Sequence, residues 1–122
     1  MAGSFGFEQL DVWNKSIVFA DRVYDLIGSF PSDERFGLTN QMRRASVSVS
    51  SNIAEGSGRG SNKEFSRFVG IACASVCEVV SQSHIARRRE FIGEPEFQEL
   101  REKADELARM LSGLRGSLDR RS

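Results

Sequence analysis

Apolar residues recur along most of the chain at alternating steps of three and four, the spacing of one face of an α-helix. The pattern is most regular between Phe97 and Leu118. Across the whole sequence it predicts helices near residues 8–29, 39–55, 61–89 and 95–117. No stretch shows the apolar–polar alternation of a half-buried strand. Because the connections are short, we expect an all-α, antiparallel up-down-up-down four-helix bundle.

The best-defined boundary lies between the second and third predicted helices. The segment 56–60 contains three glycines, which a helix interior does not tolerate cheaply. Ser61 and Glu64 then form the S-x-x-E pattern of a capping box, which restarts a helix. Gly93 and Pro95 mark the next boundary in the same way, as a helix terminator and a first-turn proline. The two middle helices should therefore form a hairpin with a specified corner.

The first predicted helix carries two apolar stripes instead of one. They are Leu10, Trp13, Ile17, Ala20, Tyr24 and Ile27, and Val12, Ser16, Phe19, Val23, Leu26 and Phe30. A surface helix of a monomeric bundle needs one apolar face. We therefore expect the first stripe to face the bundle and the second to face a partner subunit. A single wide core face is the alternative.

A stripe of mostly small residues follows one side of the third predicted helix, well away from its core face. Such residues let helices approach closely, with cysteine acting as a small hydrophobe. The predicted oligomer interface combines both surplus stripes: Val12, Phe19, Val23, Leu26, Ser66, Gly70, Cys73 and Cys77. Cys73, Cys77 and His84 also suggest metal ligands, but zinc usually needs a fourth ligand or an open catalytic position. We expect no metal and no cofactor.

Small polar residues are unusually common in the second predicted helix, which contains Ser46, Ser48, Ser50 and Ser51. Serine is a mediocre helix former, so close packing against a neighbouring helix explains them better than propensity does. Asn52, Glu55 and Gly56 follow directly at the corner. We expect a structural role for these three, with the Asn52 carboxamide bonding across the helix contact or fixing the corner.

The composition indicates one soluble domain covering residues 1–122, with 39% hydrophobic and 28% charged residues. No apolar run reaches the length of a membrane span, and the first 20 residues lack a signal-peptide pattern. Two cysteines do not make a secreted disulfide framework, so we expect a cytoplasmic protein with no membrane partner. No nucleophile elbow or P-loop is present, and we expect no catalytic residue and no enzymatic activity.

The formal net charge is zero, but charge is segregated along the chain. Residues 35–67 carry an excess of basic side chains, and this excess can form a basic face on a neutral protein. The predicted nucleic-acid contacts are Arg43, Arg44, Arg59, Lys63 and Arg67. The alternative is that these are solvated helix faces whose charges pair with one another.

The corner sequence Asn52–Gly56, N-I-A-E-G, resembles the family of ribosomal RNA intervening-sequence proteins. The resemblance extends to both sides, through Phe7-Glu8, Leu10, Val12-Trp13, Phe36–Thr39, Gln41, Arg43–Ala45, Ser48, Ser57, Arg59, Ser61, Lys63–Phe65, Phe68, Ile71-Ala72, Ser75 and Glu78. The sequence departs from the family pattern at Ser50, where proline is usual, and at Ala74 and Val80. That family is similar to the accessory variability protein of diversity-generating retroelements.

The resemblance implies a four-helix bundle that assembles as a homo-oligomeric ring, with a pentamer as the expected size. It also implies an accessory role with RNA or DNA, and a reverse transcriptase or another protein as a further partner. We expect backbone-directed binding with little base discrimination, since no aromatic residues interleave with the basic ones. The alternative function is a structural or protein-interaction module without nucleic acid, which a sequence pI near 6.6 favours.

Overall fold

The computed structural model describes residues 5–122, and this part of the chain contains helices and no strand. Two 3-10 turns precede the first and second long helices. The elements are η1 (Gly6–Gln9), α1 (Asp11–Ile27), η2 (Ser32–Glu34), α2 (Leu38–Ser57), α3 (Asn62–Arg88) and α4 (Glu94–Arg120). The all-α prediction is confirmed. The first helix starts later than expected because residues 6–9 form a 3-10 turn and Leu10 is extended.

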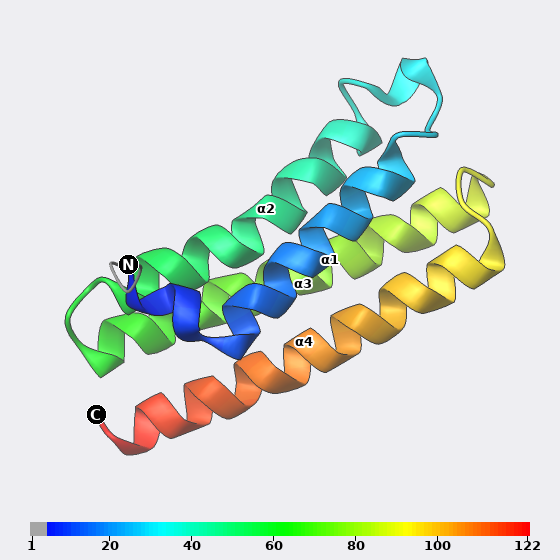
Figure 1. Ribbon diagram of the computed structural model, residues 1–122. Coiled ribbons are helices and arrows are strands. Elements are labelled where there is room, and N and C mark those ends of the chain that lie inside the picture. Colours follow the sequence, from blue (N-terminus) through cyan, green and yellow to red (C-terminus); the bar gives the residue numbers. More distant parts are fainter. Residues whose placement is uncertain (1–4) are drawn as a thin grey trace.

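The helices form an antiparallel up-and-down bundle (Figure 1). α1 packs against α2 and α4, and α3 packs against the same two helices. The corner between α2 and α3 lies at the same end of the bundle as η1 and the C-terminal end of α4 (Figure 1). The α1–α2 and α3–α4 connections lie at the opposite end. This topology places the glycine corner beside η1.

The core consists of inward-facing apolar residues from every long helix. On α4 the predicted register is confirmed, because Leu100, Ala104, Leu107 and Leu111 are all almost fully buried. The capping box at the start of α3 is confirmed in part. Ser61 accepts a hydrogen bond from the Glu64 backbone N–H at 3.1 Å, while the Glu64 carboxylate binds Arg67 instead of reaching back.

The prediction for the two stripes of α1 is wrong. Val12, Phe19, Val23 and Leu26, which we assigned to a subunit interface, lie in the core of the chain itself. Ile17 and Tyr24, from the stripe expected to face the bundle, are the exposed ones, at 41% and 48%. Both stripes have helical spacing, so periodicity alone could not show which one faces the core. Ser16 lies in the buried stripe, where its hydroxyl donates to the Trp13 carbonyl.

α3 is the one helix among residues 5–122 that is long and apolar enough to cross a membrane by length and composition. Its most apolar 18-residue window has a mean hydropathy of 1.3, and 44% of that window is buried within the bundle. A helix at the centre of a helical core has the same composition. The contacts of α3 with α2 and α4 therefore account for its buried apolar residues, whereas Ile71 and Ile85 remain exposed at 38% and 51%.

Candidate nucleic-acid interface

The corner is held by a very close approach of α2 and α3. A Cβ atom built on Gly56 would lie 2.6 Å from the Cβ of Phe68 and 3.0 Å from Cδ1 of Phe65. No residue with a side chain fits in this space. Gly56 is therefore the position that lets the first two turns of α3 pack directly onto the end of α2.

Two guanidinium groups cover the ring of Phe68 at this corner. The Cζ atoms of Arg59 and Arg67 lie 4.8 Å and 4.6 Å from the ring centroid, and Phe68 is only 6% exposed. Cation–π contacts of this kind favour arginine over an aromatic face. Phe68 thus gathers two of the predicted phosphate-binding cations at one place.

Carboxylates neutralise both of these cations. Arg59 pairs with Glu55 at 2.8 Å, and Arg67 pairs with Glu64 at 3.2 Å. The hydrogen bond from Arg67 lowers the pKa of Glu64 below its ordinary value, although partial desolvation opposes this. Lys63 is exposed and forms no ion pair with any described residue. The corner therefore carries three cations against two carboxylates.

Arg43 and Arg44 lie apart from the corner. Arg44 precedes Gly56 by 12 helical residues, which corresponds to about 18 Å along α2. The Arg43 guanidinium donates to the side-chain oxygen Oδ1 of Asn40 at 2.6 Å. Arg44 instead lines a separate hollow between α2 and α3. The structure thus brings Arg59, Lys63 and Arg67 together and leaves Arg43 and Arg44 outside that group.

Asn52 links the two middle helices through a hydroxyl network. Its Nδ2 donates to the Ser48 carbonyl at 2.8 Å and to Ser48 Oγ at 2.9 Å, and Ser75 of α3 donates to the same Oγ at 2.9 Å. Glu55 binds Arg59 rather than the corner N–H groups. Ser75 was not among the predicted site residues, although a small polar side chain opposite a serine-rich helix was the available signal.

The small-residue stripe on α3 packs partly against α4 of the same chain. Ser66 is buried and donates to the Asp119 carboxylate, and the Arg115 guanidinium lies 2.8 Å from a Cβ built on Gly70. The interface prediction is therefore wrong for Ser66, whose side chain is already covered. Cys77 remains exposed, while burial raises the pKa of the half-buried Cys73 thiol.

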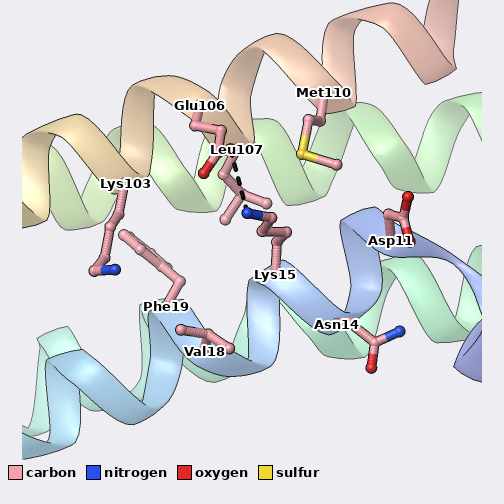
Figure 2. A pocket seen from close by; sticks show the side chains of 9 residues that line it. All are labelled: Asp11, Asn14, Lys15, Val18, Phe19, Lys103, Glu106, Leu107 and Met110. Atoms are coloured by element: carbon pink, nitrogen blue, oxygen red, sulfur yellow. Dashed lines mark hydrogen bonds and ion pairs between the residues drawn. The ribbon is translucent and has the colours of Figure 1, made fainter.

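Long side chains, including those of Lys15, Lys103 and Glu106, line the seam between α1 and α4. A hollow of about 400 Å³ lies there, with Phe19, Leu107 and Met110 at its base (Figure 2). Lys15 and Glu106 form an ion pair across it at 3.3 Å (Figure 2). His84 packs edge-on against Phe97, and no group of three potential metal ligands occurs among residues 5–122.

A model of the 23S rRNA-intervening sequence protein family matches residues 8–113. The chain is also similar to a solved structure from Bacteroides thetaiotaomicron, described as a protein with unknown function from the S23 ribosomal protein family. The two share 23% identity with a TM-score of 0.78, over 84% of this chain and 96% of the other. At that identity the likeness supports the fold alone. No curated protein matches the sequence.

Proposed function

Because the chain belongs to the 23S rRNA-intervening sequence protein family, we propose that it is a non-catalytic, cytoplasmic accessory protein that binds RNA. The binding surface is the corner cluster, which we define as Arg59, Lys63, Arg67 and the Phe68 ring between the two arginines. Arg43 and Arg44 add contacts farther along the same hairpin. A reverse transcriptase or another protein is a further candidate partner, on the resemblance alone.

The observation that carries the proposal is the excess of cations at the corner cluster. Lys63 has no ion-pair partner among the described residues, and a lysine in the first turn of a helix is electrostatically unfavourable for stability. A phosphate beside Lys63 would meet the N-terminus of α3 as well, and it could compete with Glu55 and Glu64 for the two arginines. Such contacts depend on phosphate and carry no base specificity.

Assembly into a ring would place one weak binding surface on each subunit, so that a single RNA could contact several of them. We propose that the interface uses the outer groove between α1 and α2. Leu10 and Ala54 line one hollow there. Ile17 lies seven residues after Leu10 and Val47 seven before Ala54, so the antiparallel packing of α1 on α2 points to a meeting of these two residues farther along the groove. Ile17, Tyr24 and Val47 are each at least 40% exposed. Apolar residues grouped in this way are typical of an interface. The pentamer remains an expectation from the resemblance.

Binding of a labelled single-stranded RNA at increasing salt concentration tests the function. Affinity should fall linearly on a log–log plot, and the slope should decrease by roughly 0.7 for each phosphate contact removed. Replacing Arg59 and Lys63 with alanine should weaken binding to unrelated RNA sequences about equally. The matched control is Arg88→Ala with Arg89→Ala, which removes the same charge at the opposite end of α3.

Equal losses in the two double variants would mean that overall charge, not the corner cluster, drives binding. Wild-type protein that binds neither RNA nor DNA at about 50 mM salt, where phosphate contacts are strong, would refute the proposed function. Light scattering tests the assembly. Ile17→Lys should yield a smaller species than the wild type, whereas Val18→Lys, on the α4 side of the same helix, should not.

The second candidate function is a protein-interaction module without nucleic acid. Two observations favour it: the corner arginines already have carboxylate partners, and the protein has no net charge. In that case the α1–α2 groove would be the functional surface. An assembled wild-type protein with no affinity for RNA or DNA would support this alternative.

A further inference from the structure

A polar hollow of about 400 Å³ lies in the outer groove between α2 and α3, away from the corner cluster. Its lining is Asn40, Gln41, Arg44, Ala45, Ser48 and Glu78. Arg44 and Glu78 are exposed, and neither forms an ion pair within 4.0 Å with any described residue. Two opposite charges therefore face one hollow without neutralising each other. The space between them suits a ligand that carries both an anionic group and N–H donors.

The Ser48 hydroxyl lies beside this hollow and is held by Asn52 and Ser75. A serine hydroxyl has one proton to donate and two lone pairs that accept. Asn52 Nδ2 and Ser75 Oγ both donate to Ser48 Oγ, each at 2.9 Å. When Ser75 donates as well as Asn52, the Ser48 proton is left to donate to a ligand. Asn52 and Ser75 act here as positioning residues.

Glu78 follows Ser75 by three residues on α3, about one helical turn along, and it lines the same hollow as Ser48. The hollow thus presents the Ser48 hydroxyl as a donor and, next to it, the two oxygens of the Glu78 carboxylate as acceptors. The Watson–Crick edge of guanine offers the complement, the O6 acceptor followed by the N1–H and N2–H donors. Adenine, cytosine and uracil do not offer two neighbouring N–H donors on that edge. Arg44 supplies the planar guanidinium that binds phosphate in a bidentate manner.

We propose that this hollow binds one guanine nucleotide, with Ser48 and Glu78 on the base edge and Arg44 on the phosphate. The inference rests on the RNA binding proposed above and deepens it. The corner cluster would supply affinity without base preference, and the hollow would select an unstacked guanine in a single-stranded segment. Free guanosine monophosphate carries the same chemistry, so the experiment must separate the two sources.

The experiment compares uridine-rich RNAs of equal length that carry one central guanosine, inosine or adenosine. Inosine lacks only the N2 amino group of guanosine and so removes one of the two donors to Glu78. We expect roughly tenfold weaker binding for inosine and at least that for adenosine, the size typical of one base contact. A titration with guanosine monophosphate alone shows whether the hollow takes the free nucleotide.

Glu78→Gln should abolish the preference for guanosine. Its affinity for an RNA of the same length that contains only uridine should be unchanged or slightly higher. The matched control, Glu102→Gln, removes the same charge from an exposed position on α4 and should preserve the preference. Ser48→Ala should reduce the preference as well. Thermal melting of each variant shows whether the bundle is intact.

Equal affinity of the wild type for the three RNAs would overturn the guanine site and leave the proposed RNA binding in place. Absence of all RNA binding would refute the proposed function. The inference would then survive only if guanosine monophosphate binds and Glu78→Gln abolishes that binding. A change in oligomer size on Glu78→Gln, with no change in base preference, would instead assign the hollow to a contact between copies of the chain and overturn the proposal.

Discussion

The α2–α3 contact and the α1–α4 seam are built from different residues and differ in closeness. At the first, a glycine and several serines let two helices meet so closely that Gly56 has no room for a Cβ atom. At the second, long side chains span an open hollow, and Lys15 and Glu106 pair across it in solvent. Close packing stabilises more than exposed ion pairs do. The corner end of the hairpin should therefore be more rigid than the seam.

Both regions depend on the common core, and breaking it should have the largest effect. Leu107 lies below the α1–α4 hollow and is 1% exposed, so Leu107→Asp places an unpaired carboxylate in the core. We expect a loss of about 4 kcal/mol or more in the free energy of unfolding. Urea denaturation measures it. Val18→Asp, at the exposed edge of the same hollow, is the control and should cost less than about 1 kcal/mol.

The next change tests the close approach of the hairpin directly. Gly56→Ala puts a methyl group 2.6 Å from the Cβ of Phe68, and this clash outweighs the gain in helix propensity. We expect destabilisation of about 1–3 kcal/mol, the usual cost of overpacking.

Gly113→Ala on α4 is the matched control, because nothing lies within 4 Å of a Cβ built there. It should stabilise the protein by roughly 0.5–1 kcal/mol through helix propensity alone. Thermal melting of the two variants should therefore give shifts of opposite sign. Two shifts of the same sign would contradict the close α2–α3 contact.

The hairpin was the easier region to predict from sequence, and the reason is local. Glycines and the cap at Ser61 act within a few residues, so the corner could be placed without knowing the fold. The inner face of α1 could not be predicted in this way. Val12 and Ile17 belong to stripes of equal regularity, and only tertiary packing decides which stripe faces the core. The corner cations were predicted as a group, but their pairing with Glu55 and Glu64 depends on side-chain geometry. The Ser48–Ser75 bond joins residues far apart in sequence.

Ion pairs across the seam should contribute little, and their order should follow burial. Arg22 donates from Nε and Nη2 to one oxygen of Glu99 at 2.9 Å and 2.7 Å, and its side chain is 29% exposed. The Lys15–Glu106 pair is longer, and both side chains are half exposed. Because exposed pairs are screened, we expect about 0.5–1 kcal/mol for Arg22→Ala and less than about 0.5 kcal/mol for Lys15→Ala. Denaturation at low and high salt should show this order, with the difference shrinking in high salt.

The smallest expected effect is the loss of stability in acid that comes from the Glu64–Arg67 pair at the corner. The Arg67 hydrogen bond lowers the pKa of Glu64 from its ordinary value of 4.5, so the folded state favours the ionised carboxylate. The stabilisation is therefore present above pH 4.5 and is lost as the pH falls through the lower folded-state pKa. Glu64→Gln should lie slightly below the wild type in urea midpoint at pH 7, and the gap should close in acid. Because the group is exposed, the gap should be small and should shrink in high salt. A gap that widened as the pH fell would show that the ion pair does not stabilise the folded corner.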